Sequence, residues 1–321
     1  MKRKVLLLTM LFTLCIPWLT CRIVEFWALR NMKDAARPVR GIGEERMKVI
    51  QRDEVYQIPV LINDTETVMM PLEEYLEGVL FGEMPASFHP EALKAQAVVA
   101  RTYTIKRSTQ SPKHPGGAVC TDAACCQAYR TSVDFTGEQI EKIHTAGLET
   151  EGQVLTYQNI LIDATYFSCS GGRTEAAVAV WGTDVPYLQA VDSPGEGFSD
   201  AFLDTVTYTV QEFSELLNAD LQGEPNTWFS DITYTDGGGV DEMSVCGTVY
   251  TGTQLRSLLR LRSTAFYMTA LGDSVTITTR GYGHRVGMSQ YGAEAMAQSG
   301  SCYEDILLHY YPGTVLENMS V

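Results

Sequence analysis

The sequence predicts an α+β domain, and three observations indicate this fold class. Apolar residues within 72–80 recur at helical spacing, and a second helical stretch, 90–107, begins with proline after a sharp turn. Alternating apolar and polar residues in 153–177 predict two strands joined by a Gln-Asn turn. The remaining segments mix short strands and short helices without a regular strand–helix–strand order, which is typical of α+β folds.

The length and charge of the chain narrow its possible partners. The chain has 321 residues, enough for one large domain or two modest ones, and its formal net charge is −15. A surface that binds nucleic acid needs clustered lysine and arginine. We therefore expect no nucleic acid partner.

Residues 1–24 predict a signal anchor that spans the membrane. "MKRK" is followed by the apolar run "VLLLTMLFTLCIPWLT", which Cys21, Ile23 and Val24 extend. No small-residue cleavage site is apparent, so an uncleaved anchor is favoured over a cleaved signal. The positive-inside rule then places the rest of the chain outside the cytoplasm. We expect a single-pass protein of the cell membrane with an extracytoplasmic domain.

The rest of the chain divides into a linker and a folded part. Residues 25–48 are expected to form a juxtamembrane linker, and residues 49–321 the functional domain. Within that domain, residues 205–280 contain four short strand patterns and two helical patterns, and we expect a β-rich subdomain there. A glycine-rich loop that opens a helix follows, and "YEDILLHYYPGT" closes the domain.

Glu83 is the first candidate for chemistry. It lies in "LFGEMPASF", where we expect Gly82 and Pro85 to end the first helix. The negative end of a helix dipole and apolar neighbours both raise the pKa of a carboxyl group, and proline restricts the backbone that carries it. A carboxyl group that keeps its proton near neutral pH can act as a general acid. The alternative is a structural glutamate that bonds to a neighbouring loop or pairs with Arg101.

Three long segments carry a resemblance to a known family. "LEGVLFGEMPASFHPEALKAQAVVARTYT", "ATYFSCSGGRTEAA" and "GYGHRVGMSQYGAEAMA" resemble, in this order, hallmark segments of the stage II sporulation protein D family. The similarity covers roughly residues 55–315. That family comprises membrane-anchored lytic transglycosylases of spore-forming bacteria and is related to amidase-enhancer proteins. The resemblance implies that Glu83, the glutamate of "GEMP", is the catalytic acid.

The reaction of that family fits a lone carboxylic acid. A lytic transglycosylase cleaves the β-1,4 bond between N-acetylmuramic acid and N-acetylglucosamine without water, and one residue serves first as acid and then as base. Ordinary glycoside hydrolases instead use two carboxylates. The nearby Glu91 lies in the first turn of the second helix, where the dipole keeps it charged, so we expect a structural role for it.

The resemblance also implies a cellular context. It predicts action on peptidoglycan during engulfment of the forespore, with a preference for glycan strands whose stem peptides have been removed. The implied partners are an amidase/endopeptidase like stage II sporulation protein P and other engulfment membrane proteins.

Eight residues are predicted to bind the glycan. They come from a tight Ser/Gly turn, from the glycine-rich loop and from the second helix, where backbone and side-chain donors can approach a sugar. They are Tyr166, Ser168 and Ser170, then His284, Ser289 and Gln290, and finally Arg101 and Tyr103. A rival interpretation is a cysteine nucleophile, Cys169, paired with His284, although a half-buried strand cysteine more often packs inertly.

A His/Cys cluster predicts a structural zinc site. His114, Cys120, Cys125 and Cys126 offer four ligands within thirteen residues, which suits tetrahedral zinc. Four protein ligands leave no open position, so the metal would hold a loop near the groove and would not activate water. A disulfide such as Cys120–Cys126 and free thiols are the alternatives.

Two other functional classes stay open from the sequence. A non-catalytic amidase enhancer would grip glycan and activate a separate hydrolase, and it could also keep an acid at Glu83. A zinc-dependent hydrolase would need a zinc ion with an open coordination position. The four-ligand cluster argues against this class, because it leaves no position open.

Overall fold

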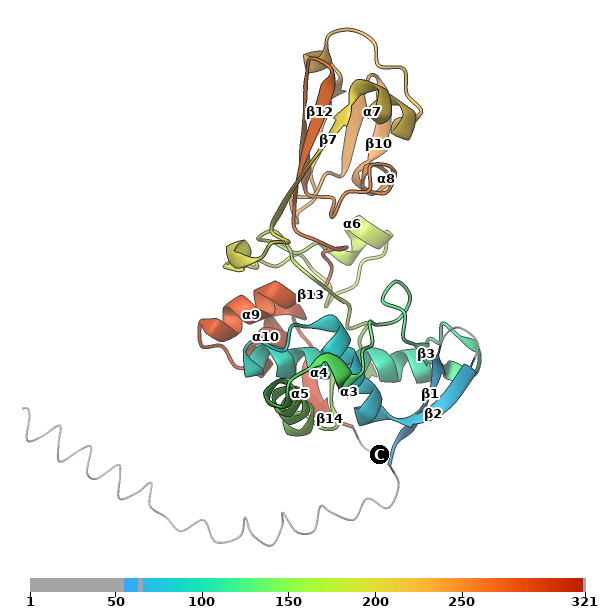
Figure 1. The fold of residues 1–321 in the computed structure, drawn as a ribbon, viewed down its shortest axis with the longest axis vertical. Coiled ribbons are helices and arrows are strands. Elements are labelled where there is room, and N and C mark those ends of the chain that lie inside the picture. The colour runs from blue at the N-terminus through green and yellow to red at the C-terminus, as the bar shows by residue number, and fades with distance from the viewer. Residues whose placement is uncertain (1–54, 63–65, 320–321) are drawn as a thin grey trace, which may run out of the picture. The chain divides into compact units, whose positions relative to one another are not determined.

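Residues 55–62 and 66–319 are described by a computed structural model of the chain (Figure 1). The α+β prediction is confirmed, because helices and mostly antiparallel strands follow one another without a regular βαβ order. The predicted anchor, 1–24, and linker, 25–48, lie outside the described residues. Within those described ranges, no helix is long and apolar enough to cross a membrane.

The helices are short apart from α4. They are α3 (Leu72–Glu83), α4 (Pro90–Thr109), α5 (Gly137–Glu149), α6 (Ala177–Trp181), α7 (Val210–Leu217), α8 (Gly252–Leu258), α9 (Gln290–Gln298) and α10 (Tyr303–Tyr310). Short 3-10 turns are η1 (Pro115–Gly117), η2 (Ser132–Asp134), η3 (Glu196–Phe198) and η4 (Pro225–Thr227).

The strands form small sheets rather than one large sheet. They are β1 (Gln57–Ile62), β2 (Glu66–Pro71), β3 (Val119–Cys120), β4 (Gln153–Tyr157), β5 (Ile160–Leu161), β6 (Tyr166–Phe167), β7 (Leu203–Thr209), β8 (Phe229–Ser230), β9 (Glu242–Val245), β10 (Thr248–Thr251), β11 (Phe266–Leu271), β12 (Ser274–Arg280), β13 (Met288–Ser289) and β14 (Val315–Asn318). The sheet orders are β2-β1-β3, β14-β4-β5, β13-β6, β11-β12-β7 and β10-β9-β8. The β1–β3 and β6–β13 pairs are parallel, and the other pairs are antiparallel.

The helix α4 is the centre of the main hydrophobic core. It begins at Pro90 as predicted, and His89 caps it by accepting a hydrogen bond from the backbone of Glu91 at 3.3 Å. Helices α3, α5, α9 and α10 all contact α4 (Figure 1). The alanines of α4 are buried and allow this close approach.

The first helix ends between Gly82 and Pro85, as predicted, but Gly82 itself is still helical. Helix α3 continues through Gly82 to Glu83, and the Met84 amide donates to the Leu80 carbonyl at 3.2 Å. Gly82 serves a different purpose, because a Cβ atom there would lie 2.6 Å from the carbonyl carbon of Ala128. The missing side chain lets the 127–129 loop lie against the end of α3. Glu83 is therefore the last helical residue.

The predicted Gln-Asn turn is confirmed. Gln158 and Asn159 both have positive φ, 51° and 63°, and they join β4 to β5. Two consecutive residues in this conformation make the tight hairpin turn that follows the natural strand twist.

The segment from Leu203 to Arg280 surrounds a separate hydrophobic cluster. Phe213, Leu255, Val275 and Ile277 are fully buried in it. Strand β12 alternates buried and half-buried residues, as expected for a sheet covered on one face. Strand β8 ends at Ser230, and an isolated bridge between Tyr234 and Val240 follows it.

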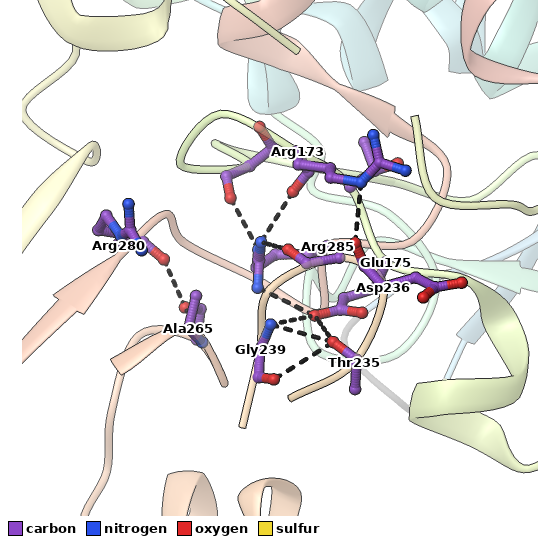
Figure 2. Close-up of polar contacts among 12 residues, drawn as sticks. Arg173, Glu175, Thr235, Asp236, Gly239, Ala265, Arg280 and Arg285 are labelled. Atoms are coloured by element: carbon purple, nitrogen blue, oxygen red, sulfur yellow. Dashed lines mark hydrogen bonds and ion pairs between the residues drawn. The ribbon is translucent and has the colours of Figure 1, made fainter. Parts of the chain in front are cut away.

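A buried ion pair connects this segment to the residues on either side of it (Figure 2). Arg285 Nη1 lies 3.1 Å from Glu175 Oε1, and the same oxygen accepts hydrogen bonds from Gly239 N at 3.0 Å and Thr235 Oγ1 at 2.9 Å. Arg285 Nη2 donates to the Gly237 carbonyl at 2.7 Å. Residues 235–239 are thus fixed to the Arg285 loop by charged hydrogen bonds.

Candidate active site

A cavity of about 820 Å³ opens at the end of α3. Of the residues predicted from sequence to act on or bind the glycan, six line it: Glu83, Tyr103, Tyr166, Ser168, His284 and Gln290. They come from α3, from α4, from β6 and the residue after it, and from the loop before α9 and the first residue of α9, which are far apart in the sequence. The parallel β6–β13 pair brings two of these segments together, since Tyr166 and Phe167 align with Met288 and Ser289.

The Glu83 carboxyl is held by the 127–129 loop, which can lie against α3 because Gly82 has no side chain. Its Oε1 accepts a hydrogen bond of 2.6 Å from the backbone N–H of Ala128. Burial raises the pKa of Glu83, and the Ala128 N–H, Tyr166 and Gln290 oppose this shift in smaller measure. Of the two structural alternatives, the bond to a neighbouring loop is formed, at Ala128, whereas Arg101 pairs with Glu73 and not with Glu83. The geometry therefore provides a positioned carboxyl group whose pKa is raised by burial.

Two polar side chains flank Glu83. Tyr166 donates its hydroxyl to Gln127 Oε1 at 3.1 Å, and burial raises its pKa well above the ordinary value, so it stays neutral. The Nε2 atom of Gln290 is buried and makes no hydrogen bond of normal geometry with any described residue. A buried amide donor without a partner at a cavity wall is available to an oxygen of a ligand.

His284 is a neutral donor in the cavity wall. Its Nδ1 accepts from the Val286 amide at 3.1 Å, which leaves the proton on Nε2. Burial, with a smaller contribution from the charge of Arg256, lowers the pKa of His284 to about 4. The ring packs against Phe167 and Trp181, with centroid distances of 5.6 and 5.4 Å.

Ser170 and Ser289 do not line the cavity. Both are fully buried and donate to Glu196, from Ser170 Oγ to Oε2 at 2.8 Å and from Ser289 Oγ to Oε1 at 2.5 Å. The amides of Ser170 and Gly171 also donate to this carboxylate, at 3.0 and 2.8 Å to Oε2. Glu196 fixes the Ser/Gly turn and the start of α9 in one network, so these serines position the cavity wall.

The nucleophile interpretation of Cys169 is not supported by its surroundings. Its thiol is fully buried and donates to Glu196 Oε2 at 3.3 Å. Burial and the neighbouring carboxylate raise its pKa to about 12, so the reactive thiolate is disfavoured.

Arg101 also lies away from the cavity. It is fully buried and forms two hydrogen bonds to the Glu73 carboxylate, at 2.8 and 2.7 Å. A third bond reaches the Gln153 carbonyl at 3.3 Å. These contacts join α4 to α3 and β4, which is a structural role.

Sequence reasoning missed two exposed aromatic residues in the cavity wall. Trp181 and Tyr282 line the cavity with 47% and 50% of their surface exposed. Exposed aromatic rings offer flat apolar faces to a ligand. A signal was available for Tyr282, which stands in the glycine-rich "GYGHR" segment, whereas Trp181 lies in α6 outside any motif.

Asp163 is the other carboxylate of the cavity lining, and it was also missed. Lys106 Nζ and Arg107 Nη2 lie 2.8 and 3.1 Å from its two oxygens. Glu91, considered from the sequence, is outside this lining and accepts from the Tyr303 amide at 2.8 Å. Asp163 is therefore neutralised by two cations, unlike Glu83.

The His/Cys cluster is assembled as predicted. The ligand atoms of His114, Cys120, Cys125 and Cys126 all lie within 4.8 Å of one another. His114 Nε2 lies 3.4 Å from Cys125 Sγ and 3.6 Å from Cys126 Sγ. In tetrahedral zinc, ligand bonds of about 2.1 and 2.3 Å put N and S about 3.5 Å apart, so the residues fit a zinc ion. The six cysteines of the described ranges are free thiols, and the Cys120–Cys126 disulfide is not formed.

Comparisons with known proteins show the family of the chain. A family model described as stage II sporulation protein matches residues 63–157, which include Glu83 and the His/Cys cluster. Stage II sporulation protein D of Bacillus subtilis (strain 168) is 40% identical over 268 residues, covering 80% of this chain and 78% of that protein. The chain belongs to the SpoIID family. The protein of the same name from Bacillus amyloliquefaciens is 39% identical over 80% of this chain and 77% of its own.

This SpoIID-family chain is also similar to a second kind of protein. The amidase enhancer of Bacillus subtilis (strain 168) is 33% identical over 306 residues, which cover 75% of this chain but 40% of that protein. The chain is therefore a SpoIID-family sporulation protein that is also related to an amidase enhancer.

The raised pKa of Glu83 predicts a pH-dependent stability difference between this SpoIID-family chain and its Glu83→Gln variant. Below the ordinary pKa of 4.5 the carboxyl is protonated in both folded and unfolded chains. As pH rises above that value, the unfolded chain ionises first and the wild type loses stability until the folded pKa is passed. Denaturant unfolding from pH 4 to 8 should show the variant gaining stability relative to the wild type as pH rises. A constant difference would contradict the raised pKa.

The His/Cys cluster predicts a measurable metal dependence. Replacement of Cys120 by Ser should weaken zinc binding by at least roughly 100-fold, since loss of an outer-shell partner alone can cost that much. Elemental analysis and competition with a chelator measure this, and Cys302→Ser, at an exposed position, is the matched control. A wild type that holds no zinc after loading would contradict the prediction.

Proposed function

We propose that the chain is a peptidoglycan lytic transglycosylase that cleaves the MurNAc-β-1,4-GlcNAc bond of glycan strands. The observation that carries the proposal is Glu83, a positioned carboxyl group with a raised pKa in the wall of a large cavity. Membership of the SpoIID family supports the cell-wall context.

The reaction requires two proton transfers at Glu83. The protonated carboxyl donates its proton to the glycosidic oxygen, and the C1–O bond of the muramoyl residue breaks with the electron pair leaving on that oxygen. The Glu83 carboxylate then removes the proton of the 6-hydroxyl of the same muramoyl residue, while O6 forms a bond to C1. The product is a 1,6-anhydro ring, and Glu83 ends protonated as it began.

The cavity supports a mechanism with a single free acid. Asp163 is neutralised by Lys106 and Arg107, whereas paired-acid hydrolases need a second free carboxylate to activate water or attack C1. Around Glu83, the Gln290 amide, the His284 Nε2–H and Ser168 can meet hydroxyl and acetamido groups. Trp181 and Tyr282 offer surfaces on which sugar rings can stack.

We assign the His/Cys cluster to a structural zinc ion. His114, Cys120, Cys125 and Cys126 would hold it, and the closed ligand set would stabilise the loop after α4. Cys125 and Cys126 also line the cavity, so the metal would fix one wall of the groove.

The proposed setting is the cell membrane of a spore-former during engulfment. Residues 1–24 would anchor the chain, and the domain would face the extracytoplasmic space and its peptidoglycan. The proposed partners are an amidase/endopeptidase like stage II sporulation protein P and other engulfment membrane proteins.

A second candidate function is that of a non-catalytic amidase enhancer, and the similarity to the Bacillus subtilis amidase enhancer favours it. Incubation of the full-length chain with purified, peptide-free glycan strands separates the two. Shortened strands in the absence of any amidase would support the transglycosylase. Intact strands, together with faster hydrolysis when an amidase and peptide-bearing peptidoglycan are supplied, would establish the enhancer instead.

A further inference from the structure

A second cavity, of about 480 Å³, is lined by three arginines of the 203–280 segment. Arg256, Arg260 and Arg262 lie around it with Tyr282. Such a concentration of positive charge stands out in a chain whose formal net charge is −15. Converging guanidinium groups favour carboxylate or phosphate ligands, because their planar donors match these anions.

Two of the three arginines have no anionic partner in the described part of the chain. Arg262 Nη2 lies 3.1 Å from Asp204 Oδ1, and its guanidinium stacks 5.6 Å from the ring centre of Tyr282. Arg256 and Arg260 make no ion pair and no side-chain hydrogen bond with any described residue. Arg256 is half-buried, so its charge is partly desolvated without compensation, which an incoming anion would supply.

The backbone at Arg260 has a conformation that favours glycine. Arg260 follows α8 with a left-handed φ of 52°, at the position where helices usually end in glycine. The Leu261 amide donates to the Arg256 carbonyl at 2.9 Å, which closes the helix end and fixes the two arginines relative to each other. The left-handed conformation costs backbone free energy for arginine, because its Cβ atom is crowded there, but not for glycine.

The arginine cavity adjoins the Glu83 cavity. Tyr282 lines both of them. Arg256 also lies close enough to His284, in the wall of the Glu83 cavity, for its charge to help lower the pKa of that imidazole. A polymer bound beside Glu83 can therefore present an anionic group to these arginines.

We propose that Arg256 and Arg260 bind the lactyl carboxylate of a muramoyl residue whose stem peptide has been removed. This inference rests on the proposed function, since it takes the glycan strand as the occupant of the Glu83 cavity. The lactyl group of such a residue ends in a free carboxylate, whereas an attached stem peptide converts it to a neutral amide. The arginine cavity thus provides a chemical reason for selecting peptide-free strands.

The test compares two forms of one glycan in the non-cleaving Glu83→Gln chain. Peptide-free strands are measured as they are and after their lactyl carboxylates have been converted to methylamides. The free carboxylate form should bind roughly ten- to a hundredfold more tightly, which is the range expected for charged hydrogen bonds. Adding Arg256→Gln and Arg260→Gln should make the two affinities equal. The matched control is Arg130→Gln with Arg280→Gln, which removes the same charge outside both cavities and should keep the preference.

Two outcomes would overturn the inference. They are equal binding of the two strand forms by the Glu83→Gln chain, and an equal loss of binding for both forms in the arginine variant. Because binding is measured without cleavage, a failure of the Glu83 chemistry would leave this comparison intact, and a lost preference would leave cleavage by Glu83 unaffected.

Discussion

Glu83→Gln is expected to lower kcat for glycan cleavage on the order of 10³-fold or more, because both proton transfers depend on this carboxyl group. The amide oxygen of glutamine can still accept the Ala128 N–H, so the end of α3 should keep its structure. KM should change little, since the variant removes a proton donor and not the cavity. Strand shortening measured by chromatography gives the rates.

The control for this change lies on the same helix. Glu74 is exposed on α3, so Glu74→Gln makes the same substitution on the same helix while leaving the cavity intact, and we expect wild-type rates. A Glu83→Gln enzyme that works within a fewfold of the wild type would exclude Glu83 as the catalytic acid.

Arg285→Met is expected to destabilise the fold by about 3–5 kcal/mol. Arg285 and Glu175 are 2% and 1% exposed, so the substitution leaves a carboxylate buried without its partner. It also removes donors to the carbonyls of Ser170 and Gly237, at 2.7 Å each, which join the Ser/Gly turn and the 235–239 loop.

An exposed ion pair provides the comparison. Arg130 and Asp134 pair at 3.2 Å with side chains 53% and 71% exposed, so Arg130→Gln should cost less than about 1 kcal/mol. Urea unfolding of both variants measures the difference. Equal effects at the two arginines would contradict the role assigned to the buried pair.

The local parts of the fold were predictable from the sequence. The start of α4 at Pro90 and the Gln158-Asn159 turn follow from residues that restrict their own backbone. The end of α3 near Gly82 was also predicted, but the contact that requires a glycine there was not. The backbone of Ala128, forty-six positions later, lies so close to Gly82 that a side chain would not fit. No local sequence pattern predicts this contact.

The sequence motifs predicted part of the lining of the candidate site. Glu83, Tyr166 and His284 do line one cavity. Ser170 and Ser289 stand in the same motifs but instead point inward and donate to the buried Glu196. Glu196 is 26 residues from Ser170 and 93 residues from Ser289 along the chain. Neighbouring residues of a strand end or turn point in opposite directions, and only the folded chain shows which side faces the cavity.

The central claim is that Glu83 cleaves the strand without water, and digestion of peptide-free glycan in heavy-oxygen water tests it most directly. We expect every new muramoyl end to carry a 1,6-anhydro ring with no heavy oxygen, and these products to be missing with Glu83→Gln. Reducing ends that contain one heavy oxygen each would show hydrolysis and contradict the claim.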